Sequence, residues 1–207
     1  VELTKEHLPF ASISANNFVS KFKTVLGMSG TLIEDKEELI NTFGADVVKI
    51  KRNLPLDRFD KGDIMFLSGK EKLRFTLQQV IDARRKQQPV LIGASNENEA
   101  NEIAKQLDSL AVYNKQISSS APQEEASIIC NAGKLGAITV STSMTGRGTD
   151  IILGGEFKEG GLVGVELEQA RKKWEDERNQ VIDAGGLLVI GYGRQRLKKQ
   201  DRQLIGR

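Results

Sequence analysis

The chain has 207 residues, of which 39% are hydrophobic and 28% charged, an ordinary composition for an α/β protein. Its net charge of +2 excludes a polycation that binds nucleic acid through overall charge. With one histidine, His7, and one cysteine, Cys130, a histidine-based zinc site and an internal disulfide are also excluded. Cys130 lies in an apolar run and is expected to be a buried structural thiol in a reducing compartment.

The first fifty residues predict two helices, at 14–25 and 34–43, and a strand at 47–50. Ser14 is the expected N-cap of the first helix, and Gly44 is expected to end the second. Between them LGMSGT, residues 26–31, forms a glycine-rich turn that carries two hydroxyl groups. A polar stretch with a proline, residues 51–63, is the predicted domain boundary.

From residue 64 onward, strands and helices alternate. The expected strands are 64–67, 89–93, 110–113, 137–140 and 187–191, and the expected helices are 70–87, 96–107, 122–132 and 165–182. Ser68 is the expected N-cap of the first of these helices, and Trp174 a packing anchor in the last. This alternation predicts an α/β fold with a parallel sheet and right-handed crossovers.

Residues 137–155, AITVSTSMTGRGTDIILGG, carry the clearest chemical pattern. An apolar strand is followed by Gly146, Arg147, Gly148, Thr149 and Asp150. Glycines beside an arginine let the backbone approach a ligand, and these groups at a strand end suit a phosphate or a nucleotide–magnesium complex. A glycine-rich turn with a surface arginine remains open from the residues alone, as does a plain ion-pair role for Asp150.

TGRGTDIILGG resembles motif V of the SecA preprotein translocase ATPases, a branch of the DEAD-like helicase superfamily. LGMSGT is similar to their motif III, QPVLIG to their motif IV strand, and DAGGLLVIG and QDRQLIGR to the segment that leads into motif VI. The resemblance covers essentially the whole chain. It implies a RecA-like parallel sheet flanked by helices: residues 1–50 end a first nucleotide-binding domain, 51–63 link, and 64–207 form the second domain, truncated within motif VI.

The sequence departs from the SecA pattern near its end. Ile205 stands where SecA proteins have arginine, and Gly193, Gln195, Arg196 and Leu197 replace glutamate, histidine, glutamate and serine. These departures indicate a divergent or accessory SecA, or a SecA-like protein with another use. The sequence also contains no GxxxxGK[ST] motif and no DEAD-type acidic pair. In SecA proteins both lie in the first domain.

The resemblance implies roles for several residues. Arg147 and Arg207 would stabilise the transition state of phosphoryl transfer, and Ser29, Gly30 and Thr31 would couple the two domains. The residues expected at ATP or ADP are Gly146, Arg147, Gly148, Thr149, Asp150, Gln203 and Arg207. No metal ligand is assigned in this chain, because the first domain would hold most of the Mg²⁺ coordination.

The implied activity is that of a protein-translocating ATPase in a longer parent, with this fragment inactive alone. The implied partners are preproteins and a SecYEG-type translocon, and the implied location is cytoplasmic, peripheral on the inner face of the plasma membrane. Two alternatives remain: the second domain of a nucleic-acid helicase, or a degenerate binding or regulatory module. The lack of a basic, aromatic-rich face argues against nucleic acid.

Overall fold

The computed structural model describes residues 11–117, 122–142, 150–161 and 163–206. The chain forms two compact units, Val1–Phe59 and Asp60–Arg207. Among the helices that the structure describes, none is both long enough and apolar enough to cross a lipid bilayer.

The N-terminal unit contains α1 (Ala15–Val19), the 3₁₀ helix η1 (Leu32–Asp35) and α2 (Lys36–Phe43). The Oγ atom of Ser14 accepts the backbone N–H of Asn17 at 3.3 Å, so Ser14 caps α1 as predicted, although α1 is much shorter than 14–25. Gly44 ends α2 in the left-handed conformation with φ +61°, which confirms its predicted role.

The strand predicted at 47–50 is wrong. The backbone there is in neither a helix nor a strand, and the side chains of Val48 and Ile50 are 80% and 85% exposed. A β-branched run favours extended backbone, but a strand also needs a neighbour to accept its hydrogen bonds. The sequence of the run does not specify that neighbour.

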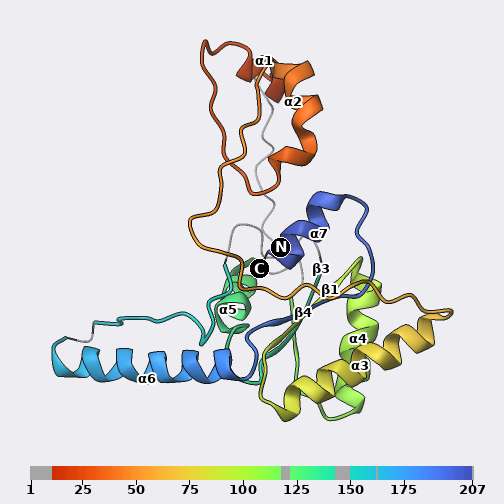
Figure 1. Cartoon of the computed structure of the whole chain (residues 1–207), viewed down its shortest axis with the longest axis vertical. Helices are drawn as coiled ribbons and strands as arrows, with labels where there is room; N and C mark the ends of the chain where they lie inside the picture. The colour runs from red at the N-terminus through yellow and green to blue at the C-terminus, as the bar shows by residue number, and fades with distance from the viewer. Residues whose placement is uncertain (1–10, 118–121, 143–149, 162, 207) are drawn as a thin grey trace, which may run out of the picture. The chain divides into compact units, whose positions relative to one another are not determined.

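The C-terminal unit is built on a parallel sheet (Figure 1), whose four described strands pair in the order β2-β3-β1-β4. Its strands are β1 (Val90–Ala94), β2 (Lys115–Ile117), β3 (Ile138–Thr142) and β4 (Leu188–Gly191). The pairings β2·β3, β3·β1 and β1·β4 are all parallel. The predicted α/β class with a parallel sheet flanked by helices is therefore confirmed.

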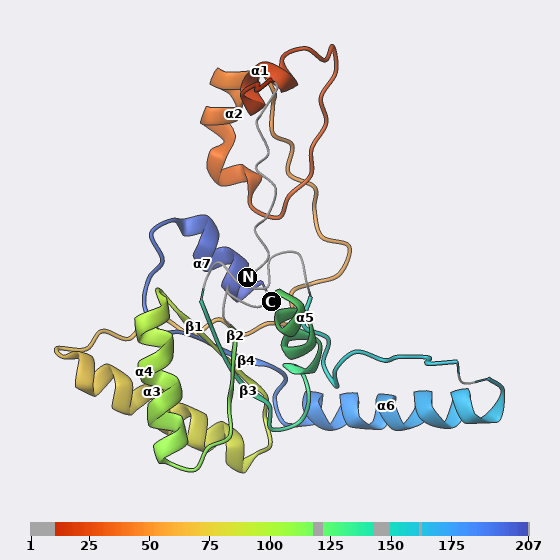
Figure 2. The ribbon, with the colours of Figure 1, turned by 180° about the vertical axis from the view of Figure 1, so that it is seen from behind.

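In the described part of this unit, the helices that accompany the sheet are α3 (Gly69–Arg85), α4 (Glu97–Ser109), α5 (Pro122–Asn131), α6 (Val165–Asp183) and α7 (Lys198–Ile205). Helices α3 and α4 lie together beside the sheet (Figure 2). Val80 of α3 and Ile103 and Leu107 of α4 form a core with Val90 and Ile92 of β1, all fully buried. Because side chains alternate along a strand, Leu91 and Gly93 face the opposite side of the sheet.

Two further strand predictions differ from the structure. Residues 64–67 are not a strand, and Met65 and Leu67 are 95% and 101% exposed. The strand expected at 110–113 lies instead at Lys115–Ile117. Val112 is buried in the core, but it belongs to the loop that precedes β2. Apolar residues indicate that a segment is buried or extended. Whether it forms a strand depends on a neighbouring strand that pairs with its backbone.

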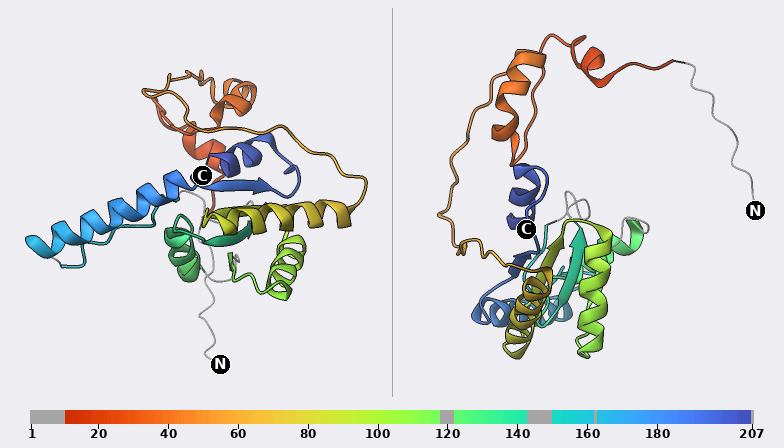
Figure 3. Two further views of the ribbon diagram at one scale, coloured as in Figure 1. Left: turned by 60° about the horizontal axis from the view of Figure 1, so that its bottom comes forward. Right: turned by 90° about the vertical axis from the view of Figure 1, so that its right-hand side faces the viewer.

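Helix α6 extends away from the sheet, and the chain that precedes it runs alongside (Figure 3). Its only buried residue is Val181, near its C-terminal end. Trp174 donates its indole N–H to the carbonyl oxygen of Gly155 at 2.8 Å, and its ring packs on Phe157 with centroids 5.8 Å apart. Trp174 is therefore a packing anchor, as predicted.

Candidate functional site

The carboxyl ends of the four strands gather at one edge of the sheet, because all four are parallel. In open α/β sheets this edge is where ligands bind. Gly93, the second-last residue of β1, lies in register with Gly191, the last residue of β4, so two glycines lie side by side near the ends of these neighbouring strands. Without side chains, these positions leave room for another element to approach the sheet closely.

Helix α7 occupies that room. Leu204, its one buried residue at 7% exposure, lies over Gly93: a Cβ atom built at Gly93 would be 2.3 Å from Leu204 Cδ2. The neighbouring residue Gln203, the predicted nucleotide contact, is half-buried. The structure therefore brings α7 and Gln203 to the carboxyl edge of the sheet.

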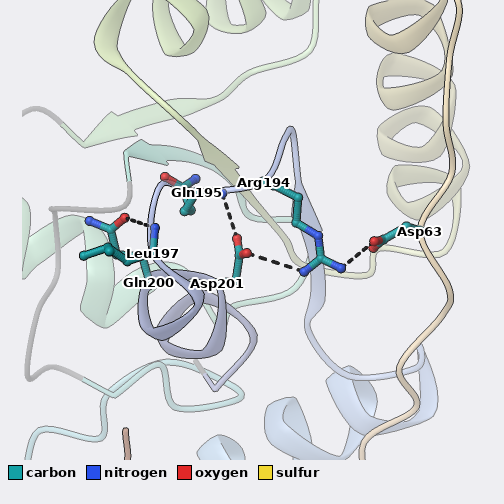
Figure 4. Close-up of polar contacts among 6 residues, drawn as sticks. All are labelled: Asp63, Arg194, Gln195, Leu197, Gln200 and Asp201. Carbon is teal, nitrogen blue, oxygen red and sulfur yellow. Dashed lines mark hydrogen bonds and ion pairs between the residues drawn. The ribbon is translucent and has the colours of Figure 1, made fainter. Parts of the chain in front are cut away.

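The loop between β4 and α7 is held by polar contacts that Figure 4 shows. Asp201 accepts the backbone N–H of Gln195 at 3.0 Å with Oδ1, and Arg194 Nη1 at 3.4 Å with Oδ2. Arg194 Nη2 pairs with Asp63 in the segment before α3. The two carboxylates, Asp63 first, raise the pKa of Arg194, which keeps the guanidinium charged.

A second polar group lies after β1. Asn96 caps α4 through its side chain, and Glu99 Oε2 accepts the backbone N–H of Ser95 at 3.0 Å. Lys72 of α3 lies 3.9 Å from Glu99 Oε1 and 3.8 Å from the ring centroid of Tyr192. Burial and the negative charge of nearby glutamates raise the pKa of the Tyr192 hydroxyl. The Asn96 side chain thus satisfies one of the free backbone donors in the first turn of α4, that of Glu99.

Most of the predicted motif V site lies outside the described residues: Gly146, Arg147, Gly148 and Thr149 are there, as is Arg207. Asp150 is described and exposed. The chain after it is fixed, because Gly154 N donates to Gly133 O at 2.8 Å. A Cβ atom at Gly133 would lie only 2.0 Å from Ile152 O. No pattern in the sequence around Gly133 predicts this close approach of the chain after Asp150.

The predicted coupling residues lie in the N-terminal unit. Ser29 and Gly30 are exposed and Thr31 is half-buried. The hydroxyls of Ser29 and Thr31 are 3.4 Å apart, and Ser29 Oγ accepts the backbone N–H of Thr31 at 3.3 Å. The turn is thus closed by its own side chains, and Thr31 makes no side-chain cap to η1.

Within the described part of the chain, no group of three or more His, Cys, Asp or Glu side chains is placed to hold a metal ion. A shallow depression of about 420 Å³ lies between α3 and the end of α4, lined by Ile81, Arg84, Arg85, Leu110 and Val112. The end of α3 leads into the amino end of β1, and the depression lies beside the end of α3. It is therefore on the side of the sheet opposite the carboxyl edge. Within this depression, Arg84 donates a hydrogen bond to Ala111 O at 3.2 Å.

The family model of the SecA P-loop domain matches residues 55–207. The chain belongs to the SecA P-loop domain family. The whole chain also aligns with proteins named "Protein translocase subunit SecA": 35% identity for that of Vesicomyosocius okutanii and 33% for those of Nitrosococcus oceani and Frankia casuarinae. It spans 22%, 24% and 23% of their lengths, about a quarter of each relative.

In this SecA P-loop domain, the residues that depart from the SecA pattern have defined contacts. Gln195, 9% exposed, donates its Nε2 to Ala94 O at 3.4 Å, which ties the loop to the end of β1. Gly193 lies so close to β1 that an added Cβ would be 3.2 Å from Ser95 Oγ. Leu197 N donates to Gln200 Oε1 at 3.3 Å. Gln195 and Gly193 thus hold this loop close to the end of β1, while Arg196 and Leu197 are exposed.

Proposed function

We propose that this chain is part of an ATP-driven protein translocase motor. ATP bound between two RecA-like domains would be hydrolysed, and the resulting domain movement would carry preproteins through a SecYEG-type membrane translocon. The observation that carries the proposal is the match to the SecA P-loop domain over residues 55–207, together with a helix docked at the carboxyl edge of a parallel sheet. The parent would work in the cytoplasm and touch the inner face of the plasma membrane peripherally.

The chemistry at this edge would be electrostatic. Phosphoryl transfer depends on positioned cations and hydrogen-bond donors around the phosphates. In the proposed site Arg147 and Arg207 supply positive charge to the transition state. Gly146, Gly148 and Thr149 surround the phosphates, and Asp150 and Gln203 hold the nucleotide from two elements.

One described residue at this edge, Gln203, supports the nucleotide-binding part of the proposal. The half-buried Gln203 offers both a donor and an acceptor on a helix that also carries Lys198, Lys199 and Arg202. No described carboxylate cluster is placed to hold Mg²⁺. In the proposal the metal is held mainly by a first nucleotide-binding domain, and Ser29, Gly30 and Thr31 couple that domain to this one.

The test is ATP hydrolysis by the full-length protein with and without preprotein and translocon-containing membranes. We expect stimulated turnover that falls about a thousandfold in Arg147→Ala, the range typical of an arginine that stabilises transferring phosphate. Arg171→Ala is the matched control, because Arg171 lies exposed on α6, where it pairs with Glu175. Residues 1–207 alone are expected to show no turnover.

The other functions give different results. Turnover stimulated by RNA and not by preprotein would indicate a nucleic-acid helicase. Nucleotide binding without turnover under any condition would indicate a regulatory or binding module. Equal turnover in Arg147→Ala and the wild type would remove Arg147 from the site.

A further inference from the structure

Three residues of the C-terminal unit form one charged group, which we call the clasp: Asp63, Arg194 and Asp201 (Figure 4). The two terminal nitrogens of the Arg194 guanidinium donate hydrogen bonds to two different carboxylates: Nη1 to Asp201 and Nη2 to Asp63. Only arginine has this forked geometry, since a lysine ammonium is a single point of charge.

Each member of the clasp belongs to a different part of the unit. Asp63 lies in the segment by which the chain enters the unit, before α3. Arg194 lies in the loop after β4, and Asp201 lies in α7. Because Asp201 Oδ1 also accepts the N–H of Gln195, both of its oxygens are engaged. The clasp therefore ties the entry segment to α7 through the loop.

Helix α7 needs such an anchor. It has eight residues, too few for a helix to be stable without tertiary contacts. Its one buried side chain, Leu204, rests on Gly93 and sets how closely the helix approaches the sheet. Asp201 is three residues before Leu204 and shares its face of the helix. A second attachment there sets the direction in which Gln203 points.

We propose that Arg194 is a positioning residue for α7, and that through Asp63 it links the entry segment of the unit to the helix that faces the nucleotide. The effect on turnover rests on the proposed function, whereas the effect on α7 does not. The two halves of the clasp differ in strength. Asp201 is 15% exposed at its side chain, but Asp63 and Arg194 are 68% and 67% exposed, so their pair is screened by salt.

The test uses the full-length protein and two measurements. Amide hydrogen exchange of residues 198–206 reports how firmly α7 is held, and steady-state ATP hydrolysis reports its consequence. In Arg194→Gln we expect exchange in α7 to rise about tenfold. We expect kcat to fall about tenfold with KM little changed, because misplacement of a catalytic element mainly weakens transition-state contacts.

Matched variants separate positioning from general damage. Arg196→Gln removes the same charge from the same loop outside the clasp and should match the wild type. Arg194→Lys keeps the charge without the fork and should be intermediate. Asp63→Asn should reproduce part of the Arg194→Gln effect at low salt and little at high salt, and Asp63→Asn combined with Arg194→Gln should be no worse than Arg194→Gln alone.

Each outcome decides one question. Wild-type exchange in α7 of Arg194→Gln overturns the positioning role, whatever the turnover. Additive effects of Asp63→Asn and Arg194→Gln overturn the link to the entry segment. Faster exchange in α7 of a protein that has no ATP turnover supports the positioning role and removes the proposed function.

Discussion

Leu204 fills the space over Gly93 but leaves room for a Cβ atom over Gly191. A Cβ atom at Gly93 would lie 2.3 Å from Leu204 Cδ2 and 2.7 Å from Cδ1. At Gly191, the residue paired with Gly93 in the sheet, the same atom would lie 3.8 Å from Leu204 Cδ2, an ordinary van der Waals distance. The two glycines look equivalent in the sequence, yet only Gly93 is required by the docking of α7.

Gly93→Ala is therefore expected to displace Leu204 and destabilise the chain by about 1–2 kcal/mol, the usual cost of mild overpacking. Gly191→Ala is the matched control and should change the free energy of unfolding by less than about 0.5 kcal/mol, as for an unstrained substitution. Urea denaturation followed by circular dichroism measures both. Equal midpoints for the two variants would show that α7 does not rest on Gly93.

The helices of this fold are predictable because their signals are local. Ser68 and Asn96 sit directly before the helices that they cap, and Gly44 directly after the helix that it ends. The strands at 47–50 and 64–67 were predicted wrongly because strand formation depends on a partner that lies far away in the sequence.

In the candidate site, too, some residues can be predicted from the sequence and others cannot. Glycines beside Arg147 and the Gln203 segment stand out in the sequence, because their residue types and spacing already suggest contact with phosphate. The pair of Arg194 and Asp63 does not stand out, since these residues are separated by 131 positions. A contact of that range is specified by the topology of the sheet, which brings the loop after β4 beside the entry segment.

The N-cap of α3 gives a second test. Ser68 Oγ accepts the backbone N–H of Glu71 at 3.2 Å, which satisfies one of the free donors in the first turn. Ser68→Ala should lower the free energy of unfolding by about 1 kcal/mol, and Ser68→Asp should keep it, because aspartate caps as well as serine. Denaturant midpoints of the three proteins measure the effect. An unchanged midpoint in Ser68→Ala would mean that water replaces the cap without cost.

Cys130 gives a pH-dependent prediction. Burial, and after it the hydrogen bond and charge of Glu156, raise the pKa of this thiol. Since the thiolate is the reactive form, Cys130 should be alkylated by iodoacetamide more slowly at pH 8 than a free cysteine, and its rate should rise at a higher pH. Glu156→Gln should speed the reaction, whereas Glu159→Gln, an exposed change on the same loop, should not. A faster reaction than free cysteine would contradict the direction of this shift.

Trp174 joins α6 to the segment 155–157. It is the only tryptophan of the chain, and it donates its indole N–H to Gly155 O at 2.8 Å while its ring packs on Phe157. Trp174→Phe keeps an aromatic ring but removes the donor, so it should cost about 1 kcal/mol, the net value of one hydrogen bond. Trp174→Ala loses the ring contact as well and should cost more.

Urea denaturation followed by circular dichroism gives both values, and hydrogen exchange at Gly154 and Gly155 should increase in both variants. Equal stability of Trp174→Phe and the wild type, with unchanged exchange, would show that ring packing alone holds the segment to α6.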